Sequence, residues 1–179
     1  MSDLPPAGPE EHVILVDEHD RRLGTMEKME AHRQGVLHRA FSIFLFNSQG
    51  ELLLHQRALD KYHSGGLWTN TCCSHPRDGE SVLEAARRRL MEEMGMSAPL
   101  EAQFTFIYKR VLDHGLTEHE LDHVLFATSD DVPSPNPAEV AGYRYASLEA
   151  VSEDIIAHPD QYTEWFKICF EAVQSRRSA

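Results

Sequence analysis

The chain has 179 residues, of which 41% are hydrophobic, so it can build one domain with a substantial core but not two domains of ordinary size. Its formal net charge of -12 argues against a nucleic-acid or anionic-membrane partner, because both require a basic surface, and no apolar run approaches the length of a membrane span. The acidic, proline-rich N-terminus is unlike a secretory signal and the three cysteines fit free thiols in a reducing compartment, so we expect a cytoplasmic protein.

Hydrophobic periodicity and turn residues predict strands and helices along residues 11–179, which we expect to form one domain behind a disordered segment 1–10. The predicted strands are Glu11–Asp17, Phe41–Phe46, Glu51–Arg57, Phe104–Val111 and His119–Thr128. The predicted helices are Glu27–Arg33, Ser81–Met94, Leu148–Ala157 and Gln161–Ser175. Strands outnumber helices and no internal repeat is visible, so the expected fold class is α/β, of the mixed α+β type.

The predicted helix Ser81–Met94 carries charged residues whose spacing resembles the Nudix box, G-x5-E-x7-R-E-U-x-E-E-x-G-U, where U is aliphatic. The matching residues are Glu80, Arg88, Leu90, Glu92, Glu93, Gly95 and Met96. The glutamates of such a box hold divalent cations against a diphosphate, because hard oxygen ligands suit magnesium. Two positions depart: Ser74 replaces the opening glycine, and Arg89 replaces a glutamate with which a hydrolase would bind metal. Hydrolysis is therefore disfavoured, and the alternative for the helix is a solvated face held by ion pairs four residues apart.

The stretch Thr117–Phe126 contains H-E-x-x-H at His119, Glu120 and His123, which on a helix would be the zinc-binding signature of a metalloprotease. The branched and aromatic residues that follow favour a strand instead. On a strand, Glu118, Glu120 and Asp122 share one face, and the two histidines share the other with Leu121. We therefore expect a pair of carboxylates here and structural roles for His119 and His123.

Further motifs resemble the type 1 isopentenyl-diphosphate delta-isomerases of the Nudix superfamily. The matching stretches are K-x3-H at Lys28 and His32, a histidine before A-F-S at His38–Ser42, W-T-N-x-x-C-x-H-P at Trp68–Pro76, the degenerate Nudix box, and E-x-E at Glu118–Glu120. The resemblance implies a Nudix-type mixed β-sheet core flanked by helices, with an N-terminal strand and a C-terminal helix added. It also implies an isomerase of isoprenoid biosynthesis that interconverts isopentenyl and dimethylallyl diphosphate by metal-assisted protonation and deprotonation of an alkene.

The resemblance assigns functional residues to three sets. It implies that one divalent metal, Zn²⁺, Mn²⁺ or Mg²⁺, is bound by His32, His38, His75, Glu118 and Glu120. It implies that the diphosphate is bound by Lys28, Arg57, Lys61 and Arg89, together with a Mg²⁺ near Glu93. It implies that the catalytic residues are Cys73, Glu120, Tyr108 and Trp165.

The reaction itself explains the types of the catalytic residues that the resemblance implies. One proton is added to the alkene and one is removed from a neighbouring carbon, so Cys73 and Glu120 are expected on opposite sides of the substrate. Tyr108 would hydrogen-bond to that glutamate, and the ring face of Trp165 would stabilise a carbocation by ~2 kcal/mol or more. Cys72 is expected to pack in the core, pointing away from its neighbour.

Two other functions are compatible with parts of this pattern. A Nudix-type diphosphohydrolase is disfavoured by Cys73, the carboxylate pair and Arg89, whereas a non-catalytic metal-binding module would leave Cys73, Tyr108 and Trp165 without a role. The expected partner is a small-molecule diphosphate, without nucleic acid or membrane, and the chain is expected to be a monomer or a weak homodimer.

Overall fold

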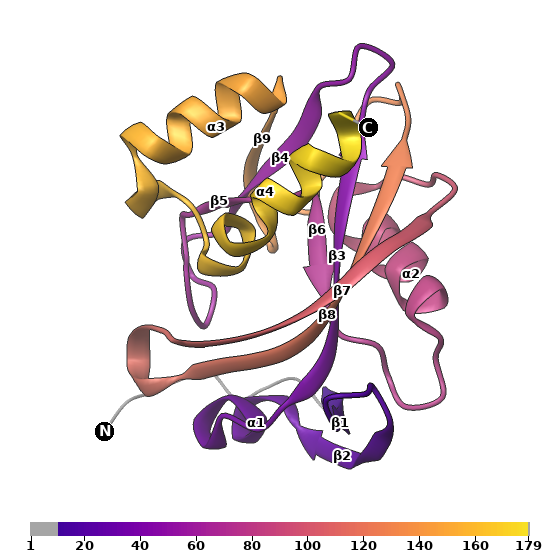
Figure 1. The fold of residues 1–179 in the computed structure, drawn as a ribbon, viewed down its shortest axis with the longest axis vertical. Helices are drawn as coiled ribbons and strands as arrows, with labels where there is room; N and C mark the ends of the chain where they lie inside the picture. The colour runs from indigo at the N-terminus through magenta and orange to yellow at the C-terminus, as the bar shows by residue number, and fades with distance from the viewer. Residues whose placement is uncertain (1–10, 179) are drawn as a thin grey trace.

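The computed structural model describes residues 11–178, which form a mixed sheet of nine strands with helices packed against it (Figure 1). The expected disordered segment 1–10 lies outside the described residues. The strands are β1 (His12–Val16), β2 (Arg22–Glu27), β3 (His38–Phe46), β4 (Leu52–Arg57), β5 (Trp68–Thr69), β6 (Cys72–Ser74), β7 (Glu101–Val111), β8 (Thr117–Thr128) and β9 (Val140–Ala146). The helices are α1 (Lys28–Gln34), α2 (Val82–Met94), α3 (Leu148–Ala157) and α4 (Glu164–Ser178), with 3-10 turns η1 (Asp113–Gly115) and η2 (Pro159–Gln161). Across this part of the chain, no helix combines the length and apolar character that crossing a bilayer requires.

Strand β3 lies at the centre of the sheet. One of its edges pairs in parallel with β8 along its whole length, from His38 opposite Glu120 to Phe46 opposite Thr128. Its other edge pairs in turn with β1, β6 and β4, all antiparallel. Strand β8 also forms a long antiparallel hairpin with β7, and β9 extends the sheet beyond β4 (Figure 1). The mixed sheet with flanking helices confirms the predicted fold class.

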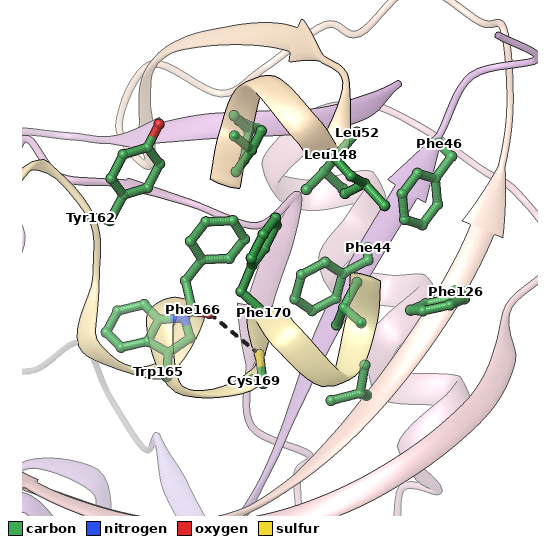
Figure 2. Close-up of a cluster of buried hydrophobic side chains, with 14 of the residues drawn as sticks. Phe44, Phe46, Leu52, Phe126, Leu148, Tyr162, Trp165, Phe166, Cys169 and Phe170 are labelled. Atoms are coloured by element: carbon green, nitrogen blue, oxygen red, sulfur yellow. Dashed lines mark hydrogen bonds between the residues drawn. The ribbon is translucent and has the colours of Figure 1, made fainter. Parts of the chain in front are cut away.

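Helices cover both faces of the sheet, α2 on one side and α3 with α4 on the other (Figure 1). Because side chains alternate along a strand, Phe41 and Ile43 of β3 join the core beneath α2, while Phe44 joins the core beneath α4. In that second core the ring of Phe166 stacks on Phe44 with 6.0 Å between centroids (Figure 2). A strand buried on both faces explains the nearly continuous apolar run of β3.

Helix α2 begins and ends as the sequence predicted. Ser81 accepts a hydrogen bond from the backbone of Glu84, whose side chain accepts one in return, which forms a capping box. Gly95 ends the helix in the left-handed conformation at φ 62°, and a Cβ there would lie 2.6 Å from the carbonyl oxygen of Ser134. Only glycine fits this end of the helix, so the position of α2 against the sheet is fixed at both termini.

Four strands were missed by the sequence prediction: β2, β9 and the two short strands β5 and β6. Strand β2 is an edge strand of the sheet, held by its backbone pairing with β1. Its side chains are largely exposed, and its sequence contains Gly24 and lacks hydrophobic alternation. In β9 only Val140 is buried, and the strand is held by its pairing with β4. Edge strands that bury few side chains carry little of the signal on which the prediction rests.

Several predicted boundaries also differ from the structure. Strand β3 starts at His38, three residues before Phe41, because its first residue pairs with β1. The last helix was predicted from Gln161 but begins at Glu164, because the chain first forms η2 and then an extended bridge in which Tyr162 pairs with Trp68. This bridge fixes α4 beside the segment that leads into β6.

Candidate active site

Three acidic side chains of β8 lie buried on the face of the sheet that α4 covers. Glu118, Glu120 and Asp122 are only 4%, 5% and 1% exposed. The strand places His119 on the opposite face, where its Nδ1 lies 3.0 Å from the carbonyl oxygen of Gly35. Residues four apart on a strand are ~13 Å apart, which is too far for two histidines to share one ion. The strand therefore excludes the helical zinc site of a metalloprotease.

Three imidazoles converge on the carboxylates from different parts of the fold. His32 comes from α1, His38 from the start of β3 and His75 from the residue after β6. Their Nε2 atoms lie 4.0 Å from Glu118 Oε1 for His32, and 3.4 Å and 3.1 Å from Glu120 Oε1 for His38 and His75. The sequence-predicted ligand set is thus brought together by four separate segments, three that carry the imidazoles and β8 with its carboxylates.

A fourth imidazole, His63, lies in the same cluster and was missed by the sequence analysis. It belongs to the loop between β4 and β5, and its Nε2 lies 3.2 Å from Glu118 Oε1. The loop has no hydrophobic period, and a histidine beside Ser64 and two glycines gave no spacing from which a ligand could be predicted. Only the fold of this loop over α1 reveals that His63 approaches His32, with 5.9 Å between ring centroids.

The buried groups of the cluster differ in their protonation. Burial and the neighbouring imidazoles lower the pKa of His32 to about 3, so this side chain is neutral. Burial opposes ionisation of Glu120, but the nearby His38 and His75 outweigh it and hold the pKa of that carboxyl well below its usual range. Burial and the two carboxylates raise the pKa of Tyr108, whose hydroxyl donates to Glu118 at 2.9 Å and to Glu120 at 2.8 Å.

These side chains fit a divalent metal ion. The Nε2 atoms of His32, His38 and His63 are buried and make no hydrogen bond to any residue that the structure describes, although each faces a carboxylate oxygen. Burying an imidazole nitrogen without a partner is unfavourable, and a cation between the nitrogens and the carboxylates satisfies both. Imidazole and carboxylate together suit several divalent metals, so the ligand types leave the identity of the metal open.

Three of the four predicted catalytic residues, Cys73, Glu120 and Trp165, line one pocket of about 30 Å³ at this cluster. The fourth, Tyr108, lies behind them and donates its hydroxyl to the glutamates of the pocket wall. Cys73 enters it from β6, whereas Cys72 points into the core beneath α2, as the alternation of an extended segment predicted. Burial raises the pKa of Cys73. Trp165 also lines the pocket, and its indole nitrogen donates to Asn70 Oδ1 at 3.2 Å, which fixes the ring.

A second cleft of about 180 Å³ adjoins the pocket and contains the predicted diphosphate-binding cations. The cations that line it are Lys28, Arg57, Lys61 and Arg89, and Glu93 lies among them. Most are held by acidic neighbours: the ammonium of Lys28 lies 2.7 Å from Glu11, and Arg89 pairs with Glu93. Within residues 11–178, the buried Nε atoms of Arg57 and Arg89 nevertheless have no hydrogen-bond partner, so these donors remain available to an anion.

Comparisons with known proteins identify the family of the chain. The model of the NUDIX domain family matches residues 36–166. The chain is 53% identical over 161 residues to an isopentenyl-diphosphate Delta-isomerase of Pectobacterium atrosepticum, covering 90% of each chain. It is 49% identical to an isopentenyl-diphosphate Delta-isomerase 2 of Aromatoleum aromaticum, covering 94% of this chain and 89% of the relative.

Solved structures with lower sequence identity share the fold. Protein DR0079 from Deinococcus radiodurans superposes with a TM-score of 0.69 at 24% identity, covering 82% of this chain and 90% of its own. A MutT protein from Methanosarcina mazei superposes with a TM-score of 0.67 at 16% identity, covering 80% of this chain and 96% of its own. The sheet and its flanking helices are therefore an arrangement that diverged sequences also adopt.

Proposed function

Because the chain belongs to the NUDIX family and, within it, to the isopentenyl-diphosphate Delta-isomerases, we propose that its pocket interconverts isopentenyl and dimethylallyl diphosphate by the residues described above. The observation that carries the assignment of residues is the convergence of Cys73 and Glu120 on one buried pocket from two strands that do not pair with each other. A double bond is moved by adding one proton and removing another, which requires two groups of this kind.

In the proposed mechanism, Glu120 and Cys73 exchange protons with the two ends of the allylic unit. The hydroxyl of Tyr108 donates to Glu120 at 2.8 Å and orients the carboxylate. When bound, the divalent ion supplies positive charge beside this carboxylate and so favours its ionised form. Protonation at one end of this unit and deprotonation at the other, on either side of the cationic carbon, leave the diphosphate ester intact, and the reverse reaction exchanges the roles of the two groups.

The proposed pocket also protects the cationic intermediate from water. Protonation of an alkene of this type produces a tertiary carbocation, which water would capture. The indole ring of Trp165 is 3% exposed and is held by Asn70 at the pocket wall, and its face can stabilise a cation by ~2 kcal/mol or more when desolvated. Trp165 also belongs to the apolar core beneath α4, beside Phe166 and Phe170 (Figure 2).

The adjoining cleft is proposed to anchor the diphosphate rather than to cleave it. Five residues line both the pocket and the cleft, so a ligand held by the cations reaches the catalytic groups: Arg57, Tyr62, Cys73, Ser74 and His75. At the position where the Nudix box has a metal-binding glutamate, the chain has Arg89, whose guanidinium lies in this cleft. Phosphate oxygens pair well with guanidinium groups, and a Mg²⁺ near Glu93 would complete the neutralisation.

Three further properties belong to this proposal. Residues 11–179 act as one domain, supported by the single sheet to which all described strands belong. The partner is a small diphosphate, with a divalent ion as cofactor. A cytoplasmic location is supported by the free thiols of all three cysteines, one of them in the pocket.

The experiment that tests the function follows two signals at once. The protein is incubated with Mg²⁺ and isopentenyl diphosphate in deuterated water, and both deuterium in the hydrocarbon and free phosphate are measured. Deuterium in dimethylallyl diphosphate without phosphate release is the expected result. Phosphate release without deuterium incorporation would instead identify a diphosphohydrolase, and neither signal from metal-loaded protein would identify a binding module.

A further inference from the structure

His63 lies within the metal-ligand cluster but is absent from the ligand set that the family resemblance implies. Its side chain is 1% exposed, and its Nε2 lies 3.2 Å from Glu118 Oε1. That nitrogen has no hydrogen-bond partner among the described residues. Among the described residues, the only other buried imidazole nitrogens without a hydrogen-bond partner are the Nε2 atoms of His32 and His38, both implied ligands.

The second ring nitrogen of each histidine is anchored in the manner of a metal ligand. A ligating histidine uses its other ring nitrogen for a hydrogen bond that fixes the tautomer and the ring orientation. The Nδ1 of His32 lies 2.7 Å from the carbonyl oxygen of Lys28, and the Nδ1 of His38 lies 2.9 Å from that of Val36. The Nδ1 of His63 lies 3.0 Å from the hydroxyl oxygen of Ser64. When Nδ1 carries the proton, the lone pair of Nε2 points toward the carboxylate pair.

The position of His63 joins it to the same cluster as the implied ligands. The ligand atoms of His32, His63 and Glu118 lie within 4.8 Å of one another, and His32 belongs equally to the group that contains Glu120. One ion can therefore be reached from both groups through the shared imidazole. Resting on the metal site of the proposed function, we propose that His63 is a further ligand of the divalent ion, which it approaches beside Glu118.

The same loop connects this ligand to the diphosphate cleft. The guanidinium of Arg57 donates through Nη2 to the backbone carbonyl oxygen of His63 at 3.0 Å. Arg57 also lines the cleft in which the diphosphate is proposed to bind. Arg57 therefore contacts both the loop that carries the proposed ligand and the proposed diphosphate cleft.

The proposal is tested by counting the imidazoles on the metal. Mn²⁺ alone, without diphosphate, is added to metal-free protein, and electron spin-echo spectra of protein labelled with ¹⁵N-histidine report the number of coordinated imidazoles. The expected count is one higher than the three implied ligands His32, His38 and His75 provide. A count of three in the wild-type protein overturns the proposal without any variant.

Variants then assign the additional imidazole. His63→Ala is expected to lose one imidazole from the count and to weaken Mn²⁺ binding by at least about tenfold in a calorimetric titration. The matched control His119→Ala removes a histidine from the opposite face of β8 and is expected to keep both values. Weaker Mn²⁺ binding with an unchanged imidazole count would mean that His63 only orients Glu118, which overturns the proposal. The proposal is also overturned if the wild-type protein binds two Mn²⁺ ions and His63→Ala loses one of them, because His63 would then hold a separate ion.

Failure of this inference and failure of the proposed function give different results. His38→Ala removes an implied ligand and is expected to abolish tight Mn²⁺ binding. If His38→Ala also bound Mn²⁺ like the wild-type protein, the metal site itself would be refuted. Isomerisation of isopentenyl diphosphate by the wild-type protein, followed by deuterium incorporation, is independent of whether His63 is a ligand.

Discussion

Replacing Tyr108 with phenylalanine isolates the contribution of one hydroxyl to the proposed chemistry. This hydroxyl lies 2.9 Å from Glu118 Oε2 and 2.8 Å from Glu120 Oε2, and it has one proton for the two carboxylates. The aromatic ring itself stacks on Phe106 with 5.5 Å between centroids, and phenylalanine preserves that contact. Tyr108→Phe therefore removes a hydrogen bond from two buried carboxylates while keeping the packing.

The expected loss of turnover follows from the strength of that bond. A hydrogen bond to a charged group contributes ~1.5–3 kcal/mol, and its removal leaves buried carboxylate oxygens without their donor. If the hydroxyl orients Glu120 in the transition state, losing the hydrogen bond raises the activation free energy by the same amount. Each ~1.4 kcal/mol of added barrier slows the reaction tenfold. We therefore expect kcat to fall by about 10- to 150-fold, with a smaller change in KM.

The assay is the rate of deuterium incorporation into dimethylallyl diphosphate at saturating Mg²⁺. Tyr143→Phe is the matched control, because that tyrosine is 39% exposed on the edge strand β9 and does not line the pocket. The control is expected to retain wild-type turnover. A folded, metal-loaded Tyr108→Phe protein whose kcat stays within about twofold of the wild type would refute the role given to this hydroxyl.

Three other perturbations have expected outcomes. Cys73→Ala should lower turnover by at least about 100-fold with the fold retained, as measured by the deuterium assay. Cys72→Ala truncates a side chain in the core beneath α2, so it should keep the activity and lower the free energy of unfolding in urea by about 1–2 kcal/mol. Glu80→Gln should destabilise the protein by about 1 kcal/mol at neutral pH, because Glu80 accepts two hydrogen bonds from Arg88 at 2.7 and 2.9 Å. The hydrogen bonds from that guanidinium hold the pKa of Glu80 below its ordinary value of 4.5, so the stabilisation is present above pH 4.5 and disappears as the pH falls through the lowered pKa. In urea unfolding, the stabilities of the variant and the wild type should converge at that low pH. A difference in stability that does not change with pH would contradict the argument. Chelation of the metal should lower the midpoint of thermal unfolding by about 5–10 °C relative to protein in metal at 100 times its Kd, measured by differential scanning calorimetry, and an unchanged midpoint would show that the cluster does not bind the ion tightly.

The elements that sequence predicted best are those that bury the most apolar surface. Strand β3 and helix α2 showed clear hydrophobic patterns because one is covered on both faces and the other packs one face against the sheet. Strands β2 and β9 were missed because backbone pairing, rather than side-chain burial, holds them at the edges. A pattern of side chains cannot reveal a strand whose side chains mostly face solvent.

The candidate site shows the same limit in its residues. Glu118 and Glu120 could be placed on one face from strand alternation alone, and the motif resemblance supplied the histidines that meet them. His63 could not be found in this way, because its approach to Glu118 depends on how the loop after β4 folds over α1. Contacts between a loop and a distant helix leave no period in the sequence, and only the structure reveals them.

The burial of the acidic face of β8 links the chemistry to the folding of the domain. Carboxylates as buried as Glu118 and Glu120 are costly to remove from water, and a single tyrosine proton cannot satisfy both. The unpartnered imidazole nitrogens facing them add to that cost. Each of these groups loses its penalty when a cation lies between them, so the ion favours the folded state over the unfolded chain, which has no preformed site. The arrangement that prepares the pocket for proton transfer therefore also destabilises the metal-free fold, and chelation should weaken the fold as well as stop the reaction.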